Sequence, residues 1–186
     1  MSPFSSYLRE IVYCGSDGIV TTFAVVAGFA GASNGEMTPS LPVLTVLLFG
    51  LANLFADASS MALGNFMSTR ADQDVYRENK NKERSEIKDN TRMEWLETVH
   101  ILKEKGYEDE DARQMANLYQ KNEKYWLDFM MSEELEMSNA EHENALMTSV
   151  ATATSFILFG FVPLIPYIFF RNHPALFILL SKIFNA

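Results

Sequence analysis

The segment LPVLTVLLFGLANLFADASSMALGNFM, residues 41–67, decides the fold class of this chain because it stays apolar over more than the thickness of a bilayer. A helix needs roughly 20 apolar residues to cross a hydrocarbon core of about 30 Å. Residues 11–32 and 145–170 have the same character, and the only ionised side chains in the three segments are Asp17 and Asp57. A lone strand would leave its backbone groups unpaired in lipid, so we expect each segment to be a helix.

The charged residues are concentrated between the second and third apolar segments. Twelve of the fifteen Lys and Arg residues lie between Arg70 and Lys124, and twenty of the twenty-four Asp and Glu residues lie between Asp72 and Glu143. This distribution is typical of a membrane protein with one soluble insert. The formal net charge of −9 disfavours nucleic acid as a partner, because phosphate binding needs a basic surface, and it favours cations.

These features predict an all-α membrane protein in three parts. Residues 11–67 form transmembrane helices 1 and 2, residues 68–144 form a cytoplasmic acidic helical domain, and residues 145–186 form transmembrane helix 3 and a partial helix 4. The last apolar run, residues 175–184, is too short to cross a bilayer. We therefore expect either that this run lies at the membrane interface or that the chain is a truncated version of a longer protein.

The distribution of positive charge predicts the orientation of the chain. The loop at residues 33–40 has no Lys or Arg, whereas the acidic domain has twelve and Arg9 precedes the first span. The positive-inside rule then places the amino terminus and the acidic domain in the cytoplasm. Residues 1–10 show no cleavable signal pattern, and the absence of a targeting segment favours a bacterial plasma membrane.

Small residues recur along the first span and predict a homo-oligomer. They are Gly15, Gly18, Ala24, Gly28 and Gly31. Small side chains permit close contact between helices in lipid, and three spans alone barely enclose a pathway. The single cysteine, Cys14, excludes an internal disulfide, and we expect it to pack as a small apolar residue.

We predict four helical stretches in the acidic domain. The first continues from the second span to about residue 88. The others lie at residues 92–105, 108–120 and 123–136. Thr91 is followed three residues later by Glu94, which is a capping-box pattern, and Gly106 is a helix stop signal.

Polar and sulfur-bearing side chains inside the spans are candidates for an ion pathway. A carboxylate within a span costs on the order of 3 kcal/mol, so we expect Asp17 to face a pathway, a partner or headgroup water. Asn53, Asp57 and Met61 are spaced four apart and share one helix face. Carboxylate together with thioether favours borderline transition metal ions over calcium and magnesium, which prefer oxygen alone.

The acidic domain contains two pairs of glutamates that are candidate metal ligands. Glu83 and Glu86 are three residues apart, as are Glu94 and Glu97, and each pair shares a helix face. On a straight helix the two pairs would be about 16 Å apart, too far to share one ion. A helix break at residues 89–91, or pairing across a dimer, would bring them together. The alternative is a solvated acidic face without metal.

A second candidate cluster lies on the last predicted helix of the domain and consists of Met130, Met131 and Glu134. Glu97 and His100 also form a Glu-x-x-His motif of the kind found in di-iron carboxylate bundles, which need two such motifs. The sequence has no second one, so we expect His100 on the surface or in the core.

Two strings of residues in the first two spans point to a known family. YCGSDGIVTTFA, residues 13–24, and LFADASSMALGN, residues 54–65, resemble the first-span and second-span signatures of the vacuolar iron transporter family. The resemblance extends from about Tyr7 to Phe184, nearly the whole chain. It implies an exporter that moves iron(II), and often manganese(II), out of the cytosol in exchange for protons, and that works as a homodimer with the pathway between the protomers.

The resemblance also implies roles for individual residues. The metal-gathering residues of the cytoplasmic domain would be Glu83, Glu86, Glu94, Glu97, Met130, Met131 and Glu134. Asp17 and Met61 would line the pathway. The best-known members carry a glutamate where this chain has Asn53. An amide can ligate a metal but cannot release a proton. Asp57, one turn along the helix, could take the place of that glutamate in proton release. The family has five spans, whereas this chain ends as the fourth begins.

We therefore predict transport of divalent transition metal ions, iron(II) or manganese(II), out of the cytosol by proton antiport. No enzyme activity and no organic cofactor is expected, and the predicted partners are a second copy, the lipid bilayer, metal ions and protons. An alternative is a membrane-anchored metal buffer or sensor without transport. A third hypothesis is a ferritin-like di-iron oxidase, which would need the missing second Glu-x-x-His motif.

Overall fold

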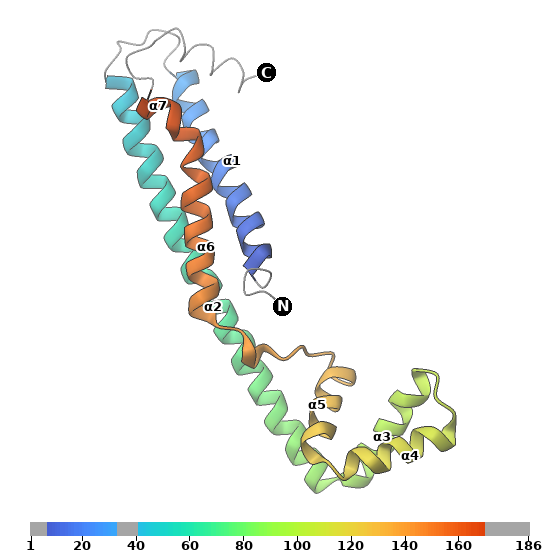
Figure 1. The fold of residues 1–186 in the computed structure, drawn as a ribbon. Helices are drawn as coiled ribbons and strands as arrows, with labels where there is room; N and C mark the ends of the chain where they lie inside the picture. The colour runs from blue at the N-terminus through green and yellow to red at the C-terminus, as the bar shows by residue number, and fades with distance from the viewer. Residues whose placement is uncertain (1–6, 33–40, 170–186) are drawn as a thin grey trace. The chain divides into compact units, whose positions relative to one another are not determined.

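The computed structural model of this protein describes residues 7–32 and 41–169. Every regular element in this part of the chain is helical, which confirms the prediction of an all-α fold (Figure 1). The α-helices are α1 (Leu8–Ala32), α2 (Leu41–Asp89), α3 (Thr91–Glu104), α4 (Asp109–Gln120), α5 (Glu123–Glu133), α6 (Ala145–Gly160) and α7 (Ile165–Phe169). Two 3-10 turns, η2 (Ala140–His142) and η3 (Val162–Leu164), complete the order.

The chain divides into two compact units. The described residues within 1–67 and 144–186 form the first unit, which contains α1, the first part of α2, α6 and α7. Residues 68–143 form the second unit, which contains the rest of α2 together with α3, α4 and α5. α2 is one uninterrupted helix of 49 residues, so it belongs to both units.

Three described helical stretches are long and apolar enough to cross a membrane, namely Leu8–Phe29, Leu44–Asp89 and Ala145–Phe169. Large apolar side chains on them are exposed in the isolated chain, and Val20 and Leu158 are each 64% exposed. A surface of this kind is costly in water and suits contact with lipid. The prediction of three apolar spanning helices is therefore confirmed.

The apolar part of α2 ends before Arg70, the first charged residue after Asp57. A membrane crossing by α2 therefore belongs to the residues before this point, and the charged remainder up to Asp89 belongs to the second unit. The partial fourth helix predicted at residues 175–184 and the loop predicted at residues 33–40 lie outside the described residues.

Glycines let α1 and α6 approach each other closely. A Cβ built on Gly18 would lie 2.6 Å from the carbonyl oxygen of Phe156, and one built on Gly160 would lie 2.9 Å from the carbonyl oxygen of Gly18. A Cβ on Gly15 would lie 2.8 Å from the ring of Phe159. Two of the small residues from which we predicted contacts between copies are therefore needed for packing within one chain.

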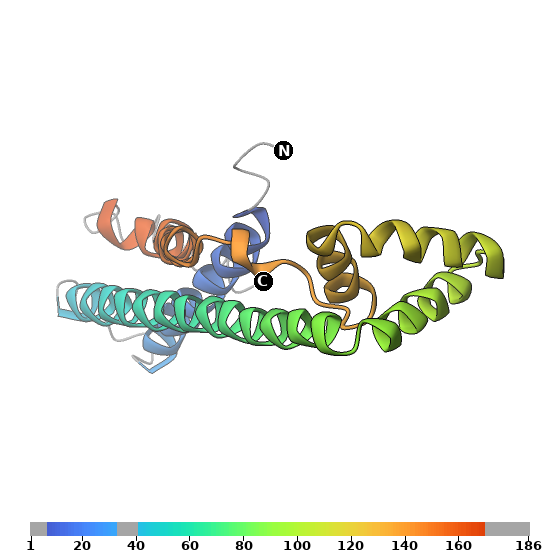
Figure 2. The same ribbon diagram turned by 90° about the horizontal axis from the view of Figure 1, so that it is seen from below.

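The second unit has its own apolar core. α2, α3 and α5 contribute to one buried cluster, which consists of Tyr76, Ile87, Ile101, Trp126, Leu127, Met130 and Met131. α3 and α4 form a hairpin that turns at Gly106, whose φ of 98° lies in the region that favours glycine (Figure 2). The hairpin buries a smaller cluster of Val99, Leu102, Ala112 and Ala116.

α5 ends at Glu133 rather than at residue 136 as predicted. Glu136 has a φ of 51°, and this left-handed conformation cannot continue a right-handed helix. The amide of Met137 donates to the carbonyl oxygen of Met131 at 3.0 Å, which closes the end of the helix. The chain therefore leaves α5 just after the position where Glu134 projects.

Candidate metal centre

A bend between α2 and α3 creates the geometry of the site. α2 ends at Asp89, Asn90 leaves the helical region with φ −127° and ψ 36°, and α3 begins at Thr91. The capping-box prediction is wrong, because Thr91 is already helical and its hydroxyl donates to the carbonyl oxygen of Ile87 at 2.7 Å. The amide of Asn90 donates to the carbonyl oxygen of Glu86 at 2.8 Å. The backbone thus stays hydrogen-bonded while the helix changes direction (Figures 1 and 2).

Three carboxylates converge because of this bend. One oxygen each from Glu83 of α2, Glu94 of α3 and Glu134 at the end of α5 lie within 4.8 Å of one another. Glu83 is 2% exposed and Glu94 is 8% exposed, while Glu134 is half-buried. On a straight helix Glu83 and Glu94 would be about 16 Å apart. The three residues therefore meet within a single chain.

Burial and mutual repulsion shift the titration of these acids. Burial raises the pKa of Glu83 to about 8, and the charge of Glu134 is the next cause. Burial also raises the pKa of Glu134 to about 7, with the charge of Glu97 next. The pKa of Glu94 is raised by burial too, although the proton that Glu83 shares with it opposes the rise. Near neutral pH the cluster therefore holds protons that a bound cation would displace.

Two oxygens of the cluster have no hydrogen-bond donor in the described part of the chain. They are Oε1 of Glu83 and Oε2 of Glu134, and both are buried. A buried polar atom without a partner costs about 1–3 kcal/mol, more if it is charged. Glu134 is also the C-cap residue of α5, where the helix dipole favours a cation. The site therefore offers oxygen ligands and a negative potential that a divalent metal ion would satisfy.

The remaining two predicted glutamates lie beside the three-carboxylate group rather than in it. Glu86 is half-buried and its carboxylate is 3.7 Å from the ammonium of Lys82. Glu97 is exposed. Each lies close enough for its charge to raise the pKa of Glu134. They contribute negative potential to the site without belonging to the compact group.

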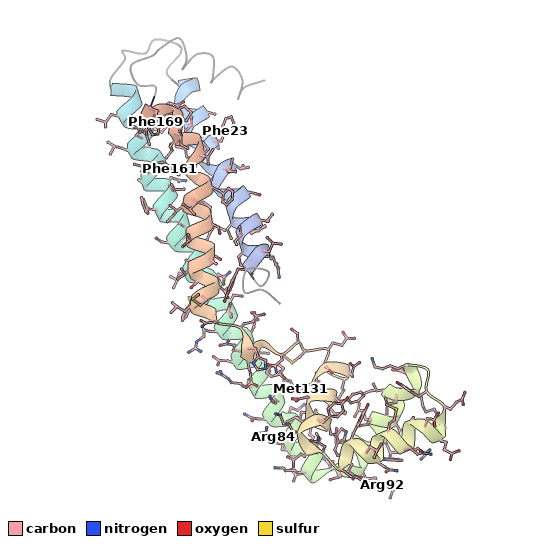
Figure 3. All side chains as sticks on the ribbon, viewed as in Figure 1. Phe23, Arg84, Arg92, Met131, Phe161 and Phe169 are labelled. Carbon is pink, nitrogen blue, oxygen red and sulfur yellow. The ribbon has the colours of Figure 1, made fainter. Side chains whose placement is uncertain are left out.

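The structure places the two predicted methionine ligands in the apolar core. Met130 is 0% exposed, and Met131, which is labelled in Figure 3, is 1% exposed. The sulfur of Met130 lies 3.3 Å from the hydroxyl of Thr98, which in turn accepts a hydrogen bond from the indole of Trp126 at 2.7 Å. The sequence predicted Trp126 only as a core aromatic residue and did not connect Thr98 or Trp126 with the site. The available signal was spacing, because Thr98 follows Glu94 by one helical turn on the same face.

His100 takes no part in the cluster. Its side chain is 72% exposed and its Nε2 atom lies 3.5 Å from the carboxylate of Glu104. The expectation that it lies on the surface or in the core is therefore met by a surface position.

The polar stripe predicted on α2 is partly linked. The amide of Asn53 donates to Oδ2 of Asp57 at 2.7 Å. Met61 packs against the buried cluster formed by Cys14, Leu54, Ala58 and Phe156. The amide thus gives the Asp57 carboxylate a partner inside the apolar unit, and Cys14 packs as the small apolar residue that we expected.

Asp17 lies apart from that stripe. It is half-buried and lines a shallow groove along the outer face of α1. The other lining residues all belong to α1, namely Leu8, Arg9, Val12, Tyr13, Ser16 and Val20. Asn53 lines a different groove, between α1 and α2, with Phe29 and Phe49. Two of the predicted pathway residues, Asp17 and Asn53, therefore line two different grooves.

Comparisons with known proteins agree with the resemblance seen in the sequence. A family model described as the VIT family matches residues 8–184. Vacuolar iron transporter 2 of Oryza sativa subsp. japonica is 36% identical over 162 residues, which are 87% of this chain and 63% of the rice protein. Vacuolar iron transporter 1 of Arabidopsis thaliana is 33% identical over 160 residues, 86% of this chain and 61% of that protein. The chain thus spans less than two thirds of the length of these relatives.

Proposed function

Because the chain belongs to the VIT family, we propose that it transports divalent iron across a membrane as a multi-pass integral membrane protein. The family that the residues of the first two spans indicated is thereby confirmed. Glu83, Glu94 and Glu134 collect the ion on the second unit before transport.

The observation that supports this proposal is the convergence of the three carboxylates. Oxygen atoms of Glu83, Glu94 and Glu134 lie within 4.8 Å of one another, and two of their oxygens are buried without a donor. Iron(II) and manganese(II) both accept carboxylate ligands, and availability often decides between such ions in cells. We therefore propose both ions as substrates, with no organic cofactor and no enzyme activity. In this proposal Glu86 and Glu97 draw the cation toward the site.

The pathway through the membrane is proposed to use Asp17, Asn53, Asp57 and Met61. Since Asp17 lies in an open groove on α1, a second copy of the chain would cover it and complete the pathway as a homodimer. Proton exchange with the metal would involve the carboxylates of Asp17 and Asp57, because Asn53 has no proton to release. The second unit would face the cytosol, by the positive-inside rule.

The membrane that holds the protein is a separate part of the proposal. A bacterial plasma membrane was predicted from the lack of a targeting segment, and the relatives named above, which are plant proteins named for the vacuole, lend this location no support. Fractionation of the source cells, followed by detection of the chain in each membrane, would decide it.

Metal flux into proteoliposomes tests the proposal. The full chain would be reconstituted with an internal metal-sensitive dye, and Fe²⁺ or Mn²⁺ uptake would be measured with and without a pH gradient. Asp17→Asn is expected to abolish uptake, and the triple variant E83Q/E94Q/E134Q to lower it at limiting metal. Glu110→Gln is the matched control, because Glu110 is an exposed acid in the first turn of α4. Uptake unchanged by Asp17→Asn would contradict the proposed pathway.

A metal buffer or sensor without transport is the second candidate function. One observation favours it: the three-carboxylate group is assembled within the second unit of one chain, so binding needs neither a dimer nor a membrane pathway. Calorimetry that shows Mn²⁺ binding to the parent protein, together with liposomes that show no flux, would select this function.

A further inference from the structure

The three-carboxylate group of Glu83, Glu94 and Glu134 lies at one end of an interface between α3 and α5. On α3, Glu94 and Thr98 are one turn apart and share a face. On α5 and its C-cap, Trp126, Met130 and Glu134 are spaced by four and also share a face. Glu94 meets Glu134, and Thr98 meets Met130 and Trp126. A step forward along α3 thus matches a step backward along α5, which is an antiparallel register.

Thr98 and Trp126 form a polar contact in the middle of this interface. Thr98 is 0% exposed and Trp126 is 1% exposed. The indole Nε1–H of Trp126 donates to the Thr98 hydroxyl oxygen at 2.7 Å. The Thr98 hydroxyl has one proton and two nearby acceptors, the carbonyl oxygen of Glu94 at 2.8 Å and the sulfur of Met130 at 3.3 Å. The carbonyl is the stronger acceptor, so the hydroxyl links the indole to the backbone of Glu94.

This contact fixes the register that apolar packing alone leaves adjustable. A slip of one residue along a helix moves a side chain by about 1.5 Å and rotates it by about 100°. Such a slip would carry Glu94 away from Glu134 while the apolar contacts could repack. The slip would also leave the indole N–H buried without an acceptor, which is unfavourable. When the carboxylates lose their protons, their repulsion would push α3 and α5 apart, and the Thr98–Trp126 hydrogen bond opposes that separation.

We propose that Thr98 and Trp126 are positioning residues that keep the metal cluster assembled before an ion binds. Neither side chain touches the ion. The hydrogen bond between them holds Glu94 opposite Glu134, so that a metal ion meets preformed ligands rather than having to order them. The inference rests on the proposed function for the identity of the ligand, whereas the register itself is independent of it.

Calorimetric titration of the full chain in detergent with Mn²⁺ tests the proposal. Thr98→Val keeps the shape of the side chain but removes the acceptor, and we expect its Mn²⁺ affinity to fall about tenfold, as for residues that orient metal ligands. Thr98→Ser keeps the hydroxyl and is expected to bind within about twofold of the parent. Val99→Ala is the control, because Val99 is buried in the α3–α4 cluster and should lower the unfolding temperature while Mn²⁺ affinity stays the same.

A double-mutant cycle separates the hydrogen bond from the two side chains. Trp126→Phe also removes the bond, so the pair T98V/W126F should lose no more affinity than the weaker-binding single variant. Parent-like affinity of Thr98→Val, an equal loss in Thr98→Ser, or losses that multiply in the pair would each overturn the proposal.

The same four proteins distinguish failure of this inference from failure of the proposed function. A parent protein that binds no Mn²⁺ would refute the metal site. The Thr98–Trp126 contact would then be tested by thermal unfolding of the four proteins without metal. Effects of the two substitutions on the unfolding temperature that fall short of additive would support the Thr98–Trp126 contact. Fully additive effects would overturn it.

Discussion

The two units of this protein arrange their acidic residues in different ways. In the second unit, Glu83, Glu94 and Glu134 come from three helices and meet within 4.8 Å inside one chain. In the first unit, Asp57 is bonded to Asn53 on its own helix, and Asp17 faces a groove formed by the α1 segment alone. In the proposed function, metal capture and metal passage would therefore have different requirements: the three-carboxylate group is assembled within one copy, whereas the proposed pathway residues would need a further surface to become a site.

Removal of the ionisable groups of the three-carboxylate group should have the largest effect, because it should abolish tight metal binding in the second unit. The triple variant E83Q/E94Q/E134Q replaces three ionisable ligands by amides of similar shape, so Mn²⁺ affinity should fall at least about 100-fold, in line with loss of charged ligands. Calorimetry at pH 8 measures this. The control Glu110→Gln should bind as the parent does, and a triple variant that still binds tightly would show that the ion lies elsewhere.

A substitution in the first unit should instead stop metal flux and leave metal binding unchanged. Gly18→Val would place side-chain atoms where even a Cβ lies 2.6 Å from the carbonyl oxygen of Phe156, so α1 and α6 must separate. Overpacking of this kind costs about 1–3 kcal/mol. We expect metal flux to be lost while Mn²⁺ affinity stays within about twofold of the parent. Gly64→Val is the matched control, because a Cβ there meets nothing within 4 Å. Equal loss of binding in Gly18→Val would contradict the independence of the two units.

The unfolding of the metal-free protein should depend on pH through the cluster. In the unfolded chain the pKa of Glu83 and Glu134 is near 4.5, whereas in the folded protein it is about 8 and about 7. The folded state binds these protons more tightly, so their contribution to stability is present below pH 4.5 and is lost as the pH rises through 7 and 8. The unfolding temperature of the parent should therefore fall more between pH 5.5 and 8.5 than that of the triple glutamine variant.

Metal affinity should change with pH in the opposite direction. Protons held by Glu83 and Glu134 compete with the ion, so Mn²⁺ affinity should rise between pH 6 and 8 and binding should release protons. Calorimetry in buffers of different ionisation enthalpy counts the protons released. Binding without proton release at pH 7 would contradict the buried, protonated state of the cluster.

The smallest expected effect comes from the bend itself. Asn90→Ala places a strong helix former at the bend and favours a continuous helix by about 0.6 kcal/mol, enough to weaken Mn²⁺ binding about threefold. Asn90→Gly keeps the bend and should bind as the parent does. Calorimetry with the full chain measures both variants, and tighter binding by Asn90→Ala would mean that the bend does not serve the cluster.

Spacing along a helix indicated two pairs of candidate glutamates, and the resemblance to the family implied that they bind metal. The spacing placed Glu83 and Glu94 three turns apart and showed that only a break at residues 89–91 or a second chain could join them. The spacing could not show which member of each pair joins the three-carboxylate group. Glu86 lies on the same helix face as Glu83, and Glu97 lies on the same face as Glu94. That choice depends on the direction in which α3 leaves the bend, which long-range packing decides.

The sequence was less informative for side chains that can either pack in the apolar core or bind a metal ion. Met130 and Met131 precede Glu134 as metal ligands would, yet both are buried in the apolar core. A thioether suits either role equally well, so composition cannot separate them. The only signal for Thr98 was its spacing from Glu94, and none linked Trp126 to it, since their contact arises only when α3 and α5 pack together. The three apolar spans, by contrast, followed directly from the length and apolar character of their segments.

The most direct test of the capture site is to locate the ion in the protein. Crystals or detergent-solubilised particles of the full chain, grown or prepared with Mn²⁺, would be examined for the metal by anomalous scattering or by density at high resolution. We predict one ion in contact with an oxygen from each of Glu83, Glu94 and Glu134. Density for Mn²⁺ only at other acidic residues, with these three side chains still facing one another without an ion, would contradict the proposed capture site.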